Sequence, residues 1–322
     1  MATSGLNTFT ENRNTIILDA LQLIGIYGIG KTVSIEDMTV CSNALNKMVK
    51  AFSNKGLQLW CKEEVILFLN QYSAQYGLGN GTGDAMVALK SDCVLTELNG
   101  ALVAGSTSFT LNTTTGMSIN DNIGIVQSDG STFWSTIATI PTSTTLTINA
   151  GITLNALNSA MIYTFTNNIY KPTQVISARL VSGLDMGSTN TISEIIMTSI
   201  AYQTYFNIPS PDINGLPTQY TYNPDISDGQ IYVWPRPSTT NYRMELSCIR
   251  QLQDLDTATD DFDFPAEWLE TLTWQLAVRI SFAFGKSALI ATLGPIASEM
   301  LNTLKMYDTE ANSIFLRPDL GY

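Results

Sequence analysis

The strongest constraint on this chain is a strongly apolar helix predicted near its end, in residues 260–285, DDFDFPAEWLETLTWQLAVRISFAFG. Acidic residues lead into Pro265, which suits a first helical turn because its missing N–H needs no partner there, and carboxylates suit the positive end of the helix dipole. Gly285 can adopt the left-handed conformation that ends many helices. Apolar side chains recur at helical spacing, on one side at Trp268, Leu269, Leu272, Leu276, Ile280 and Phe284 and on the other at Trp274, Val278 and Phe282. We therefore expect this helix to be buried nearly all round.

The composition predicts a folded, soluble protein. With 322 residues, 44% of them hydrophobic and 14% charged, the chain can form one large domain or two ordinary ones, each with its own core. No run approaches the roughly 18 apolar residues that a membrane span needs, and no basic leader precedes an apolar stretch, so we expect an unprocessed chain that does not enter a membrane. A net charge of −12 argues against a general nucleic-acid binding face, because Lys and Arg supply most of that affinity.

The sequence contains few residues that could form a catalytic or metal-binding site. The sequence has no histidine, which excludes a histidine-based catalytic triad and leaves zinc few ligands. The four cysteines lie far apart, and we interpret them as buried free thiols: Cys41, Cys61, Cys93 and Cys248. We expect no metal, no cofactor and no catalytic residue.

The segment GIYGIGKT, residues 25–32, matches the phosphate-binding pattern G-x-x-x-x-G-K-[ST] in every position. That pattern binds phosphate only when a buried strand enters the loop and the Lys-Thr pair opens the next helix. Here the preceding residues, from about Asn12, have helical spacing, and Ser34 with Asp37 predicts a later cap for the next helix. We favour a turn between two helices over a nucleotide site.

Residues 93–167 differ in composition from the rest and read as a small all-β module. Short alternating strands rich in Ser, Thr and Asn are separated by turn residues such as Asp129-Gly130, which suggests a compact barrel or sandwich inserted into the chain. The hydroxyl groups could suggest sugar binding, but the module has few aromatic residues, so solvated strand faces explain them better.

The remaining chain alternates strands and helices. VILFLN (65–70) and QVISARLV (174–181) predict strands, and EIIMTSIAYQTYF (194–206) predicts a helix. QIYVWPRP (230–237) and NYRMELSCIRQL (241–252) predict the two strands of a hairpin, whose Tyr232 and Trp234 we interpret as core or interface aromatics.

A last helix is expected from Lys286 to about Asn312, kinked or split by Pro295. Beyond it, Ile314, Phe315 and Leu316 make the tail too apolar for a simple solvated end, so we expect them to dock on a partner.

Several of these segments together resemble the head-to-tail adaptors of short-tailed bacteriophages, also called tail tubular protein A or tail accessory factor. The resemblance rests on ALNKMVKAFSNKGLQLW (44–60), ISARLV (176–181), IYVWPRP (231–237) and DFPAEWLETLTWQLAVRISFAFG (263–285). It covers roughly residues 1–90 and 170–322, and the order and spacing of the segments carry it. The residues that stand out in these segments are Leu45, Gly56, Leu57, Trp60, Trp234, Pro235, Pro265, Trp268 and Leu272.

The resemblance implies a structural virion protein without enzymatic activity, made and assembled in the cytoplasm of the host bacterium. It implies a homo-oligomeric ring of about twelve copies beneath the portal protein, joined to a tail nozzle or tube protein and to a tail fibre or tailspike. DNA would pass through the ring without specific binding.

The resulting fold prediction is α+β, with a helical-bundle adaptor core that includes strands and an inserted all-β barrel or sandwich. The adaptor core would comprise residues 1–92 and 168–322, and the inserted module residues 93–167. The rival hypothesis is a virion-associated wall or capsule glycosidase that uses carboxylates such as Asp263 or Glu267.

Overall fold

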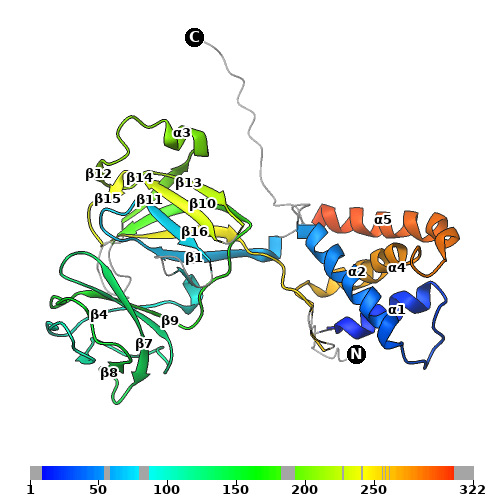
Figure 1. Ribbon diagram of the computed structural model, residues 1–322, viewed down its shortest axis with the longest axis horizontal. Helices are drawn as coiled ribbons and strands as arrows, with labels where there is room; N and C mark the ends of the chain where they lie inside the picture. The colour runs from blue at the N-terminus through cyan, green and yellow to red at the C-terminus, as the bar shows by residue number, and fades with distance from the viewer. Residues whose placement is uncertain are drawn as a thin grey trace, which may run out of the picture. The chain divides into compact units, whose positions relative to one another are not determined.

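The computed structural model describes residues 9–53, 59–79, 87–182, 193–226, 228–240, 242–255, 257, 259–260 and 262–307. The chain forms two compact units (Figure 1). The helical unit comprises Met1–Cys61 with Leu252–Tyr322, and the sheet unit comprises Lys62–Gln251. Both chain ends therefore contribute to the helical unit, and the middle of the chain forms the other.

Over the residues that the structure describes, the helical unit contains four α-helices. Their bounds are α1 (Arg13–Leu23), α2 (Ile35–Ser53), α4 (Leu269–Ile280) and α5 (Ile290–Tyr307), with short 3₁₀ turns η1 (Leu59–Cys61), η3 (Ala266–Trp268) and η4 (Ser287–Leu289). The first helix begins where the sequence predicts, because the Asn12 side chain accepts the Thr15 N–H at 3.0 Å. Helix α4 packs against α1, α2 and α5 and so forms the centre of the unit.

The expected burial of α4 on nearly all sides is wrong. Leu272 and Leu276 are fully buried, but Phe282, just past the helix end, is 72% exposed, and Trp274 and Val278 are only half-buried. Helices α1, α2 and α5 pack against α4 and leave only part of its surface open. Gly285, at φ 68°, ends this segment in the left-handed conformation that the sequence predicts.

The last helix also differs from the prediction. It begins at Ile290, after η4, and Pro295 lies inside it without splitting it. Pro295 is the sixth residue of the helix and removes one backbone bond, to the Ala291 carbonyl, and the helix continues through it. The predicted end near Asn312 lies outside the described residues.

An eight-stranded sheet forms one half of the sheet unit, in the order β2-β14-β13-β11-β10-β16-β1-β3. Its pairs are antiparallel except for β11 with β13, which is parallel. Its strands are β1 (Lys62–Phe68), β2 (Gln75–Leu78), β3 (Val87–Leu89), β10 (Gln174–Ser182), β11 (Ser193–Ser199), β13 (Gln219–Pro224), β14 (Gly229–Trp234) and β16 (Tyr242–Ile249). Beside it lie the 3₁₀ turn η2 (Lys90–Asp92), helix α3 (Tyr202–Phe206) and the small pair β12 (Asn214–Gly215) and β15 (Arg236–Pro237).

Two predictions for this region are wrong. The segments 230–237 and 241–252 do not form a hairpin, because β14 pairs with β13 and β2 whereas β16 lies between β10 and β1. The segment 194–206 is not one helix: it is strand β11 followed by the short helix α3. Consecutive β-branched residues such as Ile195 and Ile196 favour a strand, and pairing with β10 decides the outcome.

The other half of the sheet unit is a six-stranded sheet, in the order β4-β9-β6-β7-β8-β5. Backbone bonds also join its two ends, since Asn99 N–H donates to Thr110 O at 2.9 Å and Asn112 N–H donates to Glu97 O at 3.0 Å. The sheet therefore closes into a barrel, although domain boundaries at residues 93 and 167 stay a prediction. Its strands are β4 (Val94–Glu97), β5 (Ser108–Thr110), β6 (Asn122–Val126), β7 (Thr132–Thr139), β8 (Thr145–Ile148) and β9 (Met161–Phe165).

The barrel packs on one face of β1. Phe68 of β1 lies 4.3 Å from Tyr163 and 5.4 Å from Trp134, measured between ring centroids. Ile66 and Phe68 share a buried cluster with barrel residues, while Val65 and Leu67 belong to a separate core on the other face of the sheet. Strand β1 is therefore buried on both faces, which explains the nearly continuous apolar run VILFL.

The fold is mixed α+β with more sheet than helix, so the predicted α+β class is confirmed. The predicted helical-bundle core assigned more of the protein to helices than the structure does. In the stretches that the structure describes, no helix is long and apolar enough to cross a bilayer.

We predict that replacing a buried residue of α4, or of the η3 turn directly before it, destabilises the protein strongly. Leu272→Ala or Trp268→Ala should lower the free energy of unfolding by about 2–5 kcal/mol, because each removes a large side chain from close packing. Phe282→Ala is the matched control and should cost less than about 0.5 kcal/mol, because that side chain is 72% exposed. Urea unfolding measures all three, and equal losses would contradict the arrangement.

Candidate functional site

The motif residues of the helical unit build an aromatic cluster and not a catalytic site. Trp60 lies 5.0 Å from Trp268 and 5.5 Å from Phe264, and Phe52 lies 6.2 Å from Trp268, between ring centroids. The Trp60 indole N–H donates to the Asp263 backbone carbonyl at 3.1 Å. The cluster joins the end of α2, the η1 turn and the segment before α4.

The other motif residues have structural positions as well. Leu45 and Leu272 are fully buried, and Pro265 directly precedes η3. Trp234 ends β14, and its indole N–H donates to the Ser210 carbonyl at 3.1 Å before a cis bond to Pro235. Gly56, Leu57 and the three tail residues Ile314, Phe315 and Leu316 lie outside the described residues.

An exposed aromatic patch lies on the sheet unit, and the sequence analysis identified only its Tyr232 as a core or interface aromatic. Tyr232 of β14 lies within 5.3–5.8 Å of three rings of α3, between centroids: Tyr202, Tyr205 and Phe206. Tyr202 is 44% exposed and Phe206 57% exposed. Rings exposed in this way suit contact with another protein. The patch could not be predicted from one long helix over 194–206. In the structure only residues 202–206 are helical, and this short helix places its aromatic side chains beside Tyr232 of β14.

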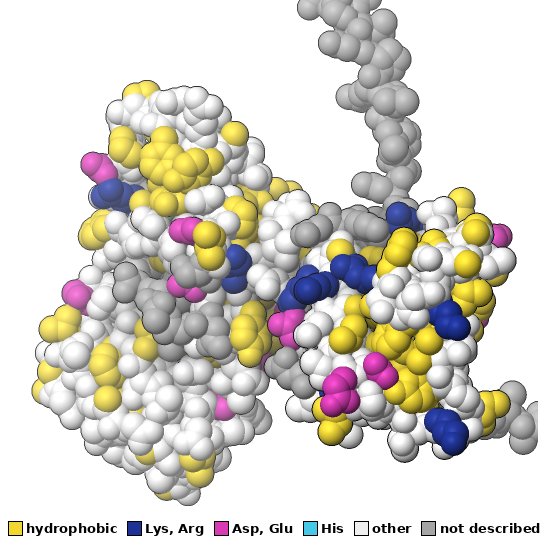
Figure 2. All heavy atoms as spheres, turned by 45° about the vertical axis from the view of Figure 1, so that its right-hand side comes forward, with side chains coloured by type: hydrophobic (Ala, Val, Ile, Leu, Met, Phe, Trp, Pro, Cys, Tyr) yellow, Lys and Arg dark blue, Asp and Glu magenta, His cyan; other side chains and the backbone are white. Residues whose placement is uncertain are grey.

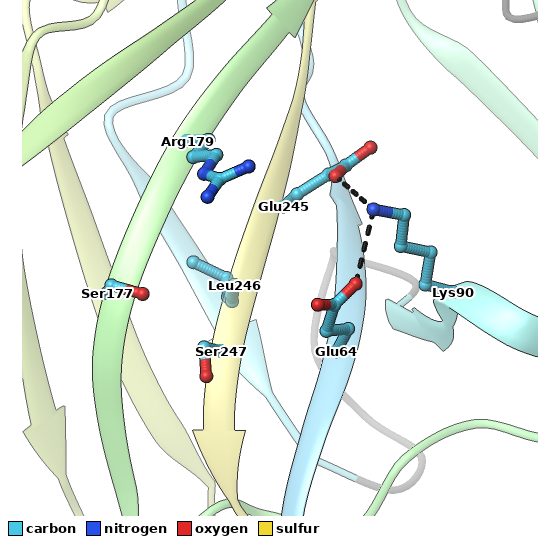
Figure 3. Close-up of a pocket in the computed structure, with 7 residues that line it drawn as sticks. All are labelled: Glu64, Lys90, Ser177, Arg179, Glu245, Leu246 and Ser247. Atoms are coloured by element: carbon cyan, nitrogen blue, oxygen red, sulfur yellow. Dashed lines mark hydrogen bonds and ion pairs between the residues drawn. The ribbon is translucent and has the colours of Figure 1, made fainter. Parts of the chain in front are cut away.

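A small charged pocket lies on the face of the eight-stranded sheet (Figure 3). Lys90 Nζ lies 2.7 Å from Glu245 Oε2 and 3.2 Å from Glu64 Oε2, and Arg243 Nε lies 3.6 Å from Glu245 Oε1. The hydrogen bond to Glu245 raises the pKa of Lys90. The pocket is lined by Glu64, Lys90, Ser177, Arg179, Glu245, Leu246 and Ser247.

This pocket is a cross-strand charge network. The ammonium group of Lys90 pairs with both carboxylates, so neither Glu64 nor Glu245 is placed to act as a separate acid or base. The cavity of about 70 Å³ has room for a few water molecules only. A further ion pair joins the neighbouring strands β10 and β11, where Arg179 Nη1 lies 3.2 Å from Glu194 Oε2. Opposite charges on neighbouring strands stabilise the sheet.

The two carboxylates of the glycosidase hypothesis do not form a site. The Asp263 carboxylate accepts the backbone N–H of Gln253 at 3.3 Å, which gives it a structural role. Glu267 is exposed in the single turn η3. Neither contact favours acid–base catalysis at these residues.

The loop GIYGIGKT joins α1 to α2, as the sequence predicts. Ser34 Oγ accepts the Asp37 N–H at 3.1 Å and caps α2, and the Asp37 carboxylate accepts the Tyr27 hydroxyl at 2.5 Å. A helix therefore enters the loop where a phosphate-binding loop requires a strand, and Lys31 lies before the cap instead of opening the helix.

The thiols are free and sheltered, as the sequence predicts: Cys41, Cys61 and Cys248 are buried and Cys93 is half-buried. Burial raises the pKa of Cys41 to about 11 and the pKa values of Cys93 and Cys248 to about 12. These thiols are therefore poor nucleophiles near neutral pH. Within the described ranges, no three His, Cys, Asp or Glu side chains are grouped so as to hold a metal ion.

A groove of about 450 Å³ lies along the first half of α2, beside Arg13 at the start of α1. Most of its lining is apolar or uncharged, and Ile35 is 82% exposed. We refer to it as the α1–α2 groove. Its lining residues are Arg13, Val33, Ser34, Ile35, Met38, Thr39, Ser42 and Asn43.

The surface of the barrel carries very little charge. Residues 93–167 include no Lys, Arg or His and only three acidic residues. Figure 2 shows the barrel surface without basic side chains and the visible Lys and Arg side chains scattered elsewhere. Such a surface is suited to contacts other than phosphate binding.

These features, namely structural motif residues, paired charges and exposed apolar surfaces, define a structural protein that works through contacts with other proteins. Residues 127–311, more than half of the chain, match the family described as the SU10 adaptor protein. The chain belongs to the SU10 adaptor protein family, which makes it a bacteriophage structural adaptor and a virion component. A comparison with curated proteins gives no match.

We predict that the GIYGIGKT loop contributes nothing to nucleotide binding. Lys31→Ala should leave any retention of ATP or GTP unchanged, because the loop lacks the strand-to-helix geometry that directs N–H groups at phosphate. Equilibrium dialysis with labelled nucleotide measures this, with Lys47→Ala on α2 as the matched control. Binding that Lys31→Ala alone weakens would refute our interpretation of the loop.

We also predict a pH-dependent contribution from Lys90. Because its pKa is raised in the folded state, its pairing stabilises the fold fully below the unfolded lysine pKa of about 10.4 and less as pH rises through the folded value. Lys90→Met should therefore be less stable than the parent at pH 7–9, with a smaller difference at pH 11.

Urea unfolding at pH 7, 9 and 11 measures this difference, with Lys47→Met on α2 as the control. A pH-independent difference would mean that Lys90 acts through packing alone.

Proposed function

We propose that this protein is the head-to-tail adaptor of a short-tailed bacteriophage, of the kind also called tail tubular protein A or tail accessory factor. About twelve copies would form a ring that joins the portal protein to a tail nozzle or tube protein and to a tail fibre or tailspike. The proposal rests mainly on the family match over residues 127–311. The protein would be made and assembled in the host cytoplasm and act without a cofactor.

Within this proposal each part of the chain has a role. The four helices together with neighbouring strands would form the adaptor core that repeats around the ring. The barrel would lie on the outside, where its nearly uncharged surface is available to a tail protein. The tail residues Ile314, Phe315 and Leu316 would dock on a partner as an apolar anchor.

The ring would also form part of the DNA channel. About twelve copies at −12 each carry a charge on the order of −140. An acidic wall repels phosphates and so lets the genome slide past without binding. The channel would therefore be a passage and not a binding site.

The glycosidase hypothesis has no observation in its favour. The Asp263 carboxylate holds a backbone N–H, Glu267 is exposed on a short turn, and the pocket carboxylates share one lysine. An adaptor family implies a protein without enzymatic activity.

We predict that free subunits are mostly monomeric and that rings form on the portal of the same phage. Negative-stain images of the protein alone and mixed with that portal test this. Free protein should show small particles, and the mixture should show portals with an added layer. Stable rings without portal would contradict template-dependent assembly, and no layer in the mixture would contradict the adaptor role. An inner wall lined by Lys and Arg would contradict the acidic channel.

A further inference from the structure

The helical unit presents two unlike surfaces on opposite sides of α4. In Figure 1, α5 lies on one side of α4, and α1 with the first half of α2 lies on the other. One surface is the outward side of α5, and the other is the α1–α2 groove. Two different surfaces on opposite sides permit a head-to-tail contact between copies, which closes into a ring when the rotation between copies allows it.

The outward side of α5 carries almost no charge. Glu299 is the one charged residue among the exposed side chains that the structure describes on this 18-residue helix. Helices that face water normally carry several charges, whereas the centres of protein interfaces are depleted of them. Figure 2 shows hydrophobic side chains exposed over this unit. The exposed residues on this side recur at helical spacing: Thr292, Pro295, Ile296, Glu299, Thr303 and Met306.

The α2 residues that line the α1–α2 groove recur at helical spacing. Among them, Ile35, Met38 and Ser42 lie three or four residues apart and so share one face of the helix. Side-chain ridges at this spacing pack into the grooves of a neighbouring helix.

The charges of the two surfaces are complementary. Arg13 is the one cation among the residues that line the groove, and Glu299 is the anion on the exposed side of α5. Arg13 Nη1 donates to the Leu255 carbonyl at 3.3 Å, which holds the positive charge of its guanidinium at the groove. A carboxylate on the incoming helix would therefore meet a cation at an otherwise uncharged surface.

We propose that α5 of one copy docks in the α1–α2 groove of the next copy, with Glu299 facing Arg13. The occupant is a second copy of this chain, because one unit carries both complementary surfaces on opposite sides. The inference rests on the proposed ring and identifies the contact that repeats around it.

Disulfide trapping tests the contact. The variants Ser42→Cys, in the groove, and Ser298→Cys, exposed on α5, are mixed with the portal and oxidised, and the products are separated without reductant. Ser143→Cys, an exposed serine of the barrel, replaces Ser298→Cys in the matched control. Mixed dimers well above this control are expected. Dimers of Ser42→Cys with itself, or no excess over the control, would overturn the proposal.

A chain with both Ser42→Cys and Ser298→Cys extends the test. A head-to-tail contact propagates, so this variant should give a ladder of linked oligomers, whereas a contact between identical surfaces stops at the dimer. A ladder supports the proposal, and a product that ends at the dimer overturns it.

Charge reversal supplies a second measurement. Glu299→Arg should lower the yield of mixed dimers about tenfold, and Arg13→Glu in the partner copy should restore it.

A substitution in the groove tests its apolar contact. Ile35→Asp should abolish trapping, whereas Ile226→Asp, at a strongly exposed isoleucine of the sheet unit, should not. Equal effects of the two isoleucine variants would overturn the contact. Failed trapping by a protein that still adds a layer to its portal would reject this contact alone, whereas trapping without that layer would reject the adaptor role.

Discussion

The antiparallel pairing of β1 with β16 is the interaction on which the rest of the structure depends. Its register joins Lys62 to Ile249 and Phe68 to Arg243, so it brings together segments from the first and last thirds of the chain. Residues before β1 and after β16 form the helical unit, and residues between them form the sheet unit. The two parts of the chain that build the helical unit also contact each other directly, because α4 packs against α1 and α2. Contacts between segments this far apart in the sequence cost loop-closure entropy, and the free energy gained from extensive burial must offset that cost.

That burial is available because β1 is covered on both faces. Val65 and Leu67 contribute to the core of the eight-stranded sheet, while Ile66 and Phe68 pack against the barrel. The same strand thus contributes to two hydrophobic clusters. The barrel is joined to the eight-stranded sheet by side-chain packing as well as by its covalent connections. On the barrel side of the sheet, β1 continues from Ile66 to Glu64, whose carboxylate pairs with Lys90, and Lys90 also pairs with Glu245, the residue opposite Ile66 on β16. This ion-pair network therefore borders the apolar contact with the barrel.

The surfaces of this protein carry its function, in keeping with an adaptor. Its aromatic motif residues Trp60 and Trp268 pack in the core of the helical unit, and several charges of the sheet unit form ion pairs. Several apolar or uncharged surfaces are open to a partner: the groove between α1 and α2, the outward side of α5, the rings of α3 and the barrel. Protein interfaces have this character at their centres, because the desolvation of unpaired charges is costly.

The sequence by itself determined the local features that depend on neighbouring residues. The cap at Asn12, the turn between α1 and α2, the left-handed Gly285, the β1 strand and the sheltered thiols follow from short-range spacing and composition. Only the tertiary structure decided which strands pair, because pairing depends on contacts across the whole chain: β14 and β16 look like a hairpin and lie apart in the sheet. It also decided that residues 194–199 form a strand beside β10, where backbone bonding outweighs helical periodicity, and that α4 keeps an open side bearing Phe282. The motif residues could be found from the sequence, but the exposed surfaces could not, because exposure is a property of what the rest of the chain leaves uncovered.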